Sequence, residues 1–94
     1  MIVGPGSRPR LASRARLRLD RQTGQKVLLY PERGLVLNAV GQAVLELCAP
    51  DRTVEDIVAV LKERYVADAA QVRTEVLTFL QQLADRGLLE ESAP

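Results

Sequence analysis

The sequence predicts an α+β domain in which a small three-stranded antiparallel β-sheet is followed by a three-helix bundle, a winged-helix-like order of elements. Three observations predict this fold. Residues 14–20 alternate between polar and apolar side chains, residues 27–37 hold two apolar runs separated by a turn-forming segment, and residues 38–86 carry three stretches of helical periodicity. A chain of 94 residues has the length of one such domain.

The first predicted strand is residues 14–20, where apolar side chains occupy every second position and alternate with charged ones. The residues expected to face the core together are Ala15, Leu17 and Leu19. The segment 22–25 then supplies a turn, because Gly24 accepts a positive φ at no steric cost.

The second and third predicted strands flank a tight loop. Residues 27–30 are apolar throughout, as expected of a strand between two neighbours, and Pro31 ends the strand because it has no N–H to donate. Pro31–Gly34 suits a hairpin loop with Gly34 in the left-handed conformation. Leu35–Leu37 is then a short third strand, expected at the edge of the sheet.

Capping residues divide the remainder into helices. Asn38 is a preferred N-cap for a helix that reaches about Cys48 and stops at Pro50. Its expected inner face is Val40, Val44, Leu47 and Cys48. Thr53 and Asp56 form a capping box for the second helix. Its expected buried side chains are Val54, Ile57, Val58, Leu61 and Tyr65.

The third helix carries the strongest helical periodicity. It is expected to begin after Asp68, to run to about Arg86 and to end at a left-handed Gly87. Its expected core stripe is Val72, Val76, Phe79, Leu80 and Leu83. Leu88 and Leu89 are expected to fold back onto the core.

The Gly- and Pro-rich start of the chain predicts a flexible N-terminal arm over residues 1–10. Residues 11–90 then form a single recognition domain, and residues 91–94 form a C-terminal tail.

The composition argues against an enzyme. The chain has no histidine and one cysteine, so the usual ligand sets for zinc, haem and iron–sulfur clusters are missing, as is a histidine base. We expect no catalytic residue, no metal site and no cofactor. Cys48 is interpreted as a core residue, and a lone cysteine without an internal disulfide fits the reducing cytoplasm. No apolar run reaches the length of a membrane span.

Arginine is concentrated near the N-terminus at Arg8, Arg10, Arg14, Arg16, Arg18 and Arg21. Three interpretations are open for this cluster. It could contact phosphates, but no aromatic residues are interleaved for stacking on bases. It could be the charged face of an edge strand, where positive charge discourages aggregation, and we favour this interpretation. It could also bind an acidic partner protein.

A winged helix raises the alternative of nucleic-acid binding, in which the third helix would enter the major groove. Such a helix should be basic. Here Arg73 and Arg86 are outnumbered by Asp68, Glu75 and Asp85, so a duplex would repel it.

The third helix also has a partly apolar row at three- and four-residue spacing, formed by Arg73, Leu77, Leu80, Gln81 and Ala84. Leu77 could simply widen the core stripe. Alternatively, this row and the strand Leu35, Val36 and Leu37 are the two walls of a groove. An extended peptide could then add a strand to the open edge, and Arg73 could pair with a peptide carboxylate. An open edge also allows a homodimer by strand exchange.

Four segments carry motifs of one protein family: Arg16–Asp20, Leu28–Asn38, Arg52–Ile57 and Leu83–Leu89. The most distinctive is Leu28–Asn38, with Pro-Glu after the apolar run and Leu-Asn at its end. On these residues the chain resembles the PqqD family of pyrroloquinoline quinone (PQQ) biosynthesis over about residues 8–90. Ala49–Asp51 departs from the family pattern, in which Asp-Gly usually follows the first helix.

The resemblance implies a peptide chaperone, or RiPP recognition element, with three strands and three helices. Proteins of this family bind the ribosomal precursor peptide PqqA and present it to the radical SAM enzyme PqqE, which joins a Glu and a Tyr of that peptide. The iron–sulfur clusters and SAM belong to that enzyme. A chain without histidine and with one cysteine is consistent with this division of roles.

Overall fold

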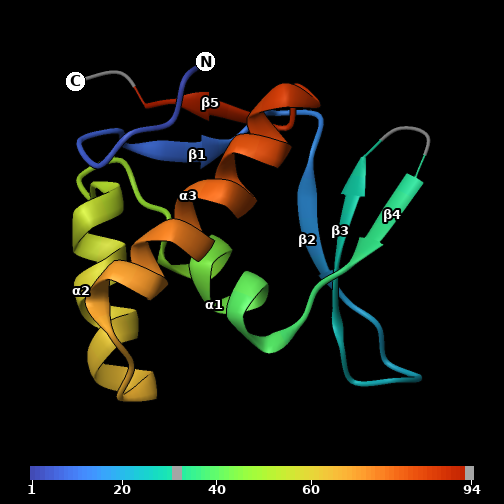
Figure 1. Cartoon of the computed structure of the whole chain (residues 1–94). Coiled ribbons are helices and arrows are strands. Elements are labelled where there is room, and N and C mark those ends of the chain that lie inside the picture. Colours follow the sequence, from blue (N-terminus) through green and yellow to red (C-terminus); the bar gives the residue numbers. More distant parts are fainter. Residues whose placement is uncertain (31–32, 93–94) are drawn as a thin grey trace.

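The computed structural model of the protein describes residues 1–30 and 33–92. Within this part of the chain, five strands and three helices follow one another (Figure 1). They are β1 (Pro9–Leu11), β2 (Arg16–Leu19), β3 (Lys26–Tyr30), β4 (Arg33–Val36), α1 (Ala39–Leu47), α2 (Val54–Tyr65), α3 (Ala69–Asp85) and β5 (Leu89–Glu91). None of the helices in the described ranges is long and apolar enough to cross a membrane.

The predicted three-stranded sheet is confirmed. β2, β3 and β4 form an antiparallel sheet in that order, so that β3 is the middle strand, and the sheet stands beside the helices (Figure 1). The register places Leu17, Leu28 and Leu35 next to one another across the three strands. Leu28 is fully buried, and the other two pack against the core. This row fixes which face of the sheet meets the helices.

The predicted bounds of the hairpin between β3 and β4 need correction. Gly34 lies inside β4 opposite Leu29, and the positive-φ glycines are Gly24 and Gly87. The left-handed Gly34 was therefore wrong, whereas the other two left-handed glycines are confirmed. The remaining loop residues, Pro31 and Glu32, lie outside the described residues.

The two ends of the chain pair with each other. β1 and β5 form a separate two-stranded antiparallel sheet (Figure 1). Val3 is buried, and the backbone oxygen of Ser7 accepts a hydrogen bond of 2.9 Å from the Val54 N–H at the start of α2. Residues 1–10 therefore have contacts that a flexible arm lacks, and Glu91 belongs to a strand instead of a tail. Strands of three residues are too short for their periodicity to be recognised in a sequence.

The predicted caps begin the helices. Asn38 Oδ1 accepts from the Gly41 N–H at 2.7 Å, and Asp68 caps α3. Thr53 and Asp56 form the capping box of α2: the Asp56 N–H donates to Thr53 Oγ1 at 3.2 Å, and the Thr53 N–H donates to Asp56 Oδ2 at 2.9 Å. Short polar side chains at these positions satisfy N–H groups that have no partner inside the helix.

Three expected core assignments were wrong at the ends of elements. Val40 is at the surface, whereas Val44, which was expected on the same inner face of α1, is buried together with Gly41, Ala43 and Leu45. Tyr65, the last residue of α2, is 45% exposed, and Leu19, the last residue of β2, is 54% exposed. Side chains at an element's end extend past the layer that would cover them. Leu47, Cys48 and Phe79 are half-buried.

The central core lies between α2, α3 and the sheet. It confirms the stripes of the two longer helices: Val54, Ile57, Val58 and Leu61 from α2, and Val72, Val76, Leu80 and Leu83 from α3. Leu88 and Leu89 fold back onto it, as expected. β3 therefore has a rigid support, because its buried row packs against this core.

We expect Leu80→Ala to lower the free energy of unfolding by about 3 kcal/mol, because it leaves a cavity at a fully buried position. Urea denaturation followed by circular dichroism would measure the loss. Ile2→Ala is the control: Ile2 is 91% exposed, so its truncation should change the stability by less than about 0.5 kcal/mol. Equal losses in the two variants would contradict the assignment of the core.

Candidate functional site

The outer edge of β4 presents backbone groups without a partner strand. In the ladder between β3 and β4, the Leu37 N–H donates to the Lys26 oxygen at 3.2 Å. Bonded and non-bonded residue pairs alternate in an antiparallel ladder, so Leu35 bonds to β3 whereas Gly34 and Val36 point their N–H and C=O groups away from it. Within residues 1–30 and 33–92, β4 pairs with β3 alone.

The ladder on the other side of β3 supports this assignment. The Asp20 N–H donates to the Gln25 oxygen at 2.8 Å, and this bond belongs to the β2–β3 hairpin. Counting along its register, Val27 and Leu29 bond to β2, which leaves Lys26, Leu28 and Tyr30 to bond to β4. The two ladders therefore agree on which residues of β3 form hydrogen bonds with β2 and which with β4.

The side chains of β4 alternate between the two faces of the sheet. Leu35 packs against the core, and Leu37, just after the strand, is almost fully buried. Val36 points to the opposite face and is 61% exposed. Two leucines therefore anchor this segment, and the residue between them is left accessible. The edge predicted from the sequence is present: among the described residues, no strand pairs with the outward N–H and C=O of Val36.

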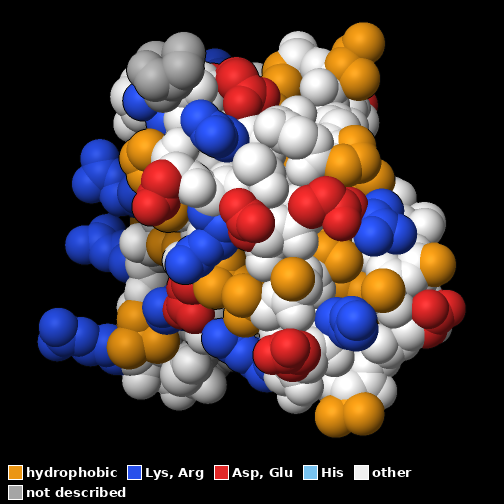
Figure 2. All heavy atoms as spheres, turned by 90° about the vertical axis from the view of Figure 1, so that its left-hand side faces the viewer, with side chains coloured by type: hydrophobic (Ala, Val, Ile, Leu, Met, Phe, Trp, Pro, Cys, Tyr) orange, Lys and Arg blue, Asp and Glu red, His pale blue; other side chains and the backbone are white. Residues whose placement is uncertain are grey.

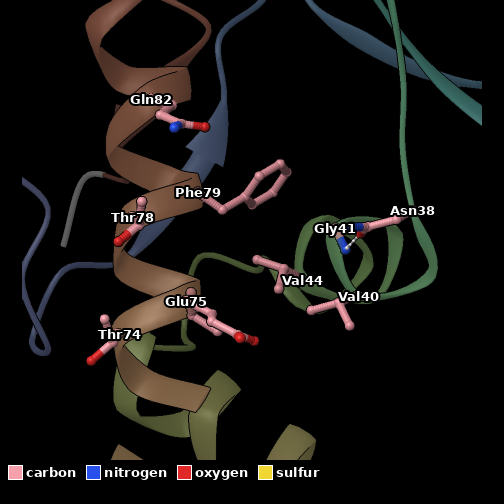
Figure 3. Close-up of a pocket in the computed structure, with 10 residues that line it drawn as sticks. Asn38, Val40, Gly41, Val44, Thr74, Glu75, Thr78, Phe79 and Gln82 are labelled. Carbon is pink, nitrogen blue, oxygen red and sulfur yellow. Dashed lines mark hydrogen bonds between the residues drawn. The ribbon is translucent and has the colours of Figure 1, made fainter. Parts of the chain in front are cut away.

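A hollow of about 390 Å³ lies between the start of α1 and one face of α3 (Figure 3). Its lining residues are Asn38, Val40, Gly41, Val44, Thr74, Glu75, Val76, Thr78, Phe79 and Gln82. In Figure 3, Phe79 and Glu75 extend from α3 towards α1, while Val40 and Val44 lie across from them. The chain passes from β4 directly into Asn38, so one end of the open edge adjoins the hollow.

Gly41 allows the two helices to approach at this hollow. A Cβ atom at residue 41 would lie 3.2 Å from Asn38 Oδ1 and 3.3 Å from the Phe79 ring. Both contacts are tighter than ordinary van der Waals contact. Glycine thus accommodates the helix cap and the aromatic ring together, and the ring forms one wall of the hollow.

The lining of the hollow combines apolar side chains from both helices with polar side chains of α3. Val40, Val44 and Phe79 supply apolar surface, while threonine and glutamine side chains lie along the α3 side. Of the lining residues, Glu75 alone carries a charge. Such a hollow is suited to an apolar side chain, with a positive charge favoured close to Glu75.

The α3 row selected from the sequence lies on other faces of the helix. Leu80 is 0% exposed, so it is a core residue and not a groove wall, and Ala84 packs against the same core. Gln81 holds the N-terminal segment: its Oε1 accepts from the Val3 N–H at 2.8 Å, and its Nε2 donates to the Met1 oxygen at 3.0 Å. Leu77 lines a separate hollow of about 390 Å³ beside Val3.

Arg73, the charged member of that row, is already paired. It donates from Nε and Nη2 to the two carboxylate oxygens of Glu55 at 2.5 and 3.1 Å. The hydrogen bond from Arg73 holds the pKa of Glu55 below its usual value, and that of Arg73 is raised in turn. Arg73 therefore faces α2 and does not line the hollow beside α1.

The α3 face that does line the hollow was missed because Phe79 was assigned to the core. Glu75, Phe79 and Gln82 follow one another at spacings of four and three residues, so they form a row beside the buried stripe. Glu75 and Gln82, which lie about one turn before and after Phe79 on the same row, are polar, and this was the signal in the sequence that the row faces outward. Leu35 and Val36 lie in β4, and Leu37 follows it. The roles of these residues and of the α3 row in peptide binding stay predictions.

Within the described ranges, no group of three or more acidic or cysteine side chains could hold a metal ion. The thiol of Cys48 donates to the Val44 oxygen at 3.4 Å, and burial raises its pKa to about 11. A thiol in this state is a poor nucleophile at neutral pH, because the thiolate is the reactive form.

Comparison with known proteins identifies the family. The family described as Coenzyme PQQ synthesis protein D (PqqD) matches residues 25–89. The chain belongs to the PqqD family. A relative from Rhodopseudomonas palustris (strain BisB5), named PqqA binding protein, is 41% identical over 97 residues, which cover 100% of this chain and 95% of that protein.

The PqqD relatives include a fused form and solved structures. A bifunctional coenzyme PQQ synthesis protein C/D from Methylorubrum extorquens is 39% identical over 82 residues, which cover 87% of this chain and 22% of that protein. The solution structure of the PqqD part of Methylobacterium extorquens PqqCD, described as a stand-alone RiPP recognition element, matches with a TM-score of 0.82 at 36% identity and covers 95% of each chain.

A further structure, TbiB1 in complex with the TbiA(β) leader peptide, matches with a TM-score of 0.75 at 25% identity and covers 90% of this chain and 99% of that chain. The PqqD fold is thus similar to that of a protein with a bound leader peptide.

We expect Cys48 to react slowly with iodoacetamide at pH 8. A pKa of about 11 lowers the thiolate fraction roughly a hundredfold relative to an unfolded cysteine, and the higher nucleophilicity of a more basic thiolate recovers only part of this loss. Mass spectrometry should show labelling at least about tenfold slower in the native protein than in urea. Equal rates would contradict the burial of this thiol.

Proposed function

We propose that this chain binds the precursor peptide PqqA in PQQ biosynthesis and presents it to the radical SAM enzyme PqqE. The observation that carries the proposal is the open edge of β4, with the outward N–H and C=O groups of Gly34 and Val36. Relatives that carry the name PqqA binding protein support the choice of peptide. The leader-peptide complex of a structural neighbour supports binding of a peptide by this fold.

The backbone of the peptide would provide the first set of contacts. A strand added beside β4 exchanges hydrogen bonds with Gly34 and Val36 and extends the sheet from three strands to four. Each bond contributes roughly 1 kcal/mol and depends little on the peptide's sequence. These bonds set the register, so selectivity has to come from side chains.

The hollow between α1 and α3 would provide the selective contact. A peptide strand along β4 passes the start of α1, and its side chains alternate between the two faces of the sheet. An apolar side chain directed to the helical face can enter the hollow and pack on Phe79. In this proposal, packing on Phe79 takes the place of the peptide contacts that the sequence predicted for Leu77, Leu80, Gln81 and Ala84. A salt bridge from Arg73 to the peptide is not required.

The proposed role is binding, and the chemical change to the peptide belongs to the partner enzyme. Rigid support suits this role, because an edge strand fixed by Leu35 and Leu37 loses little conformational entropy when the peptide binds. The alternative of a nucleic-acid-binding winged helix loses one of its few basic contacts on α3, because Arg73 is paired with Glu55.

We expect Val36→Pro to abolish measurable binding of synthetic PqqA. Proline removes the outward N–H of residue 36, and its ring occupies the space where a peptide carbonyl would approach. Isothermal titration calorimetry measures the affinity, and circular dichroism checks that the variant is folded.

Leu19→Pro is the matched control for this variant. Leu19 occupies the opposite edge of the sheet, and the β2–β3 register directs its N–H away from β3 as well. This variant should bind the peptide within about twofold of the wild-type affinity, because one edge does not contact the other. An unchanged affinity in folded Val36→Pro would overturn strand addition at β4.

We expect Phe79→Ala to weaken PqqA binding about tenfold, whereas Leu77→Ala leaves it within about twofold. Both variants truncate a half-buried apolar side chain of α3, but Phe79 lines the hollow beside α1 and Leu77 lines the one beside Val3. Titrations of the two variants under one condition decide which face of α3 meets the peptide. The reverse order of effects would restore the face inferred from the sequence.

A further inference from the structure

The sheet has a second face, which points away from the helices (Figure 1). Cross-strand partners on this face form two rows, because side chains opposite one another share a face. The rows are Arg18–Val27–Val36 and Arg16–Leu29–Gly34. We call these residues the outer sheet face. Its base is apolar, and both of its β2 positions are arginine.

The outer sheet face is accessible and hollowed. Val36 is 61% exposed, and Val27 and Leu29 are half-buried. Two shallow hollows, of about 310 and 300 Å³, share Leu29 as a wall. Arg18, Val27 and Leu29 contribute to the first hollow, and Arg16 and Leu29 contribute to the second.

Among the described residues, no ion pair neutralises the arginines of this face. In residues 1–30 and 33–92, the ion pairs join Arg10 to Glu90, Lys26 to Glu46 and Arg73 to Glu55, and none includes Arg16 or Arg18. Among the described residues that line the two hollows, Asp20 alone has a carboxylate; it lines the first hollow, and its Oδ1 accepts from the Gln22 N–H at 2.9 Å. The face therefore carries a net positive charge beside apolar surface.

The surface over α2 has a different character. Figure 2 shows acidic and basic side chains interspersed with apolar ones on that side of the molecule. On the outer sheet face, the arginines of an edge strand could serve only to prevent aggregation. This role does not account for the exposed Val36 and the half-buried Val27 and Leu29 beside them.

The composition of the outer sheet face fits a protein partner better than a nucleic acid. Protein interfaces combine an apolar centre with arginine, whereas a single-strand binder stacks successive bases on several aromatic side chains. Among the described residues that line the two hollows, Tyr30 alone is aromatic. Arginine also forms bidentate hydrogen bonds with carboxylates. The complementary surface is therefore an apolar side chain surrounded by Asp or Glu.

We propose that the outer sheet face is a second docking surface, which binds an acidic protein surface of the enzyme that modifies the bound peptide. The identity of the partner rests on the function proposed above. Val36 connects the two surfaces, because its backbone lies at the open edge while its side chain lies on the outer face. An enzyme docked there contacts the sheet directly beside the peptide and leaves the hollow between α1 and α3 free.

The test uses the double variant Arg16→Glu/Arg18→Glu and the purified radical SAM enzyme PqqE of the same organism as probe. The matched control, Lys62→Glu/Arg64→Glu, makes the same change in net charge on exposed positions of α2, outside the sheet. Both variants and the wild type are titrated with the enzyme in the absence of peptide and, separately, with synthetic PqqA.

We expect the sheet variant to bind the enzyme about tenfold more weakly than the wild type and with a shallower dependence on salt, while the control stays within about twofold. Both variants should bind PqqA within about twofold of the wild type. An unchanged enzyme affinity, or equal losses in the two variants, would overturn the proposal.

Other occupants of this face give distinct results. Light scattering that shows a wild-type dimer dissociated by the sheet variant would assign the face to a second copy of the chain and overturn the proposal. Binding of duplex DNA that the variant abolishes would overturn it as well. If the wild type does not bind PqqA, the proposed function fails, and the titration with the enzyme still decides whether the outer sheet face docks a protein.

Discussion

The hydrogen-bond alternation of β3 is the constraint on which the site depends. The backbone N–H and C=O of each residue in a middle strand form hydrogen bonds with one neighbouring strand only. Lys26, Leu28 and Tyr30 bond to β4, and the residues between them bond to β2. The burial of Leu28 fixes this alternation, because a shift of the strand register by one residue would turn the buried leucine row to solvent. The same alternation directs the N–H and C=O groups of Gly34 and Val36 to the edge, where no strand of the described part of the chain pairs with them.

The side chains of α3 form three rows, and each row makes different contacts. One row, with Leu80 at its centre, completes the core. A second row contacts the N-terminal segment through Gln81 and the second helix through Arg73. The third row carries Phe79 and lines the hollow beside α1. Adjacent rows of a helix contain residues that are close in sequence. Assigning a residue to the neighbouring row therefore turns a predicted core residue into a surface residue.

The pairing of the two chain ends determines which part of α3 the N-terminal segment contacts. β1 and β5 join residues about eighty positions apart, and Gln81 holds Met1 and Val3 against α3. The N-terminal segment borders one hollow on its side of α3, and the start of α1 borders the other hollow on a different side of the helix. The accessible surface of α3 is thus defined as much by the N-terminal segment as by the helix itself.

The sequence by itself determined the central strands, the three helices, their caps and the core of α2 and α3, because these depend on local periodicity and on single capping residues such as Asn38 and Thr53. It also indicated the open edge at Leu35–Leu37. Only the tertiary structure decided that residues 1–10 pack, that Arg73 pairs with Glu55 and that Phe79 faces α1. These facts depend on contacts between distant segments, which local patterns do not record.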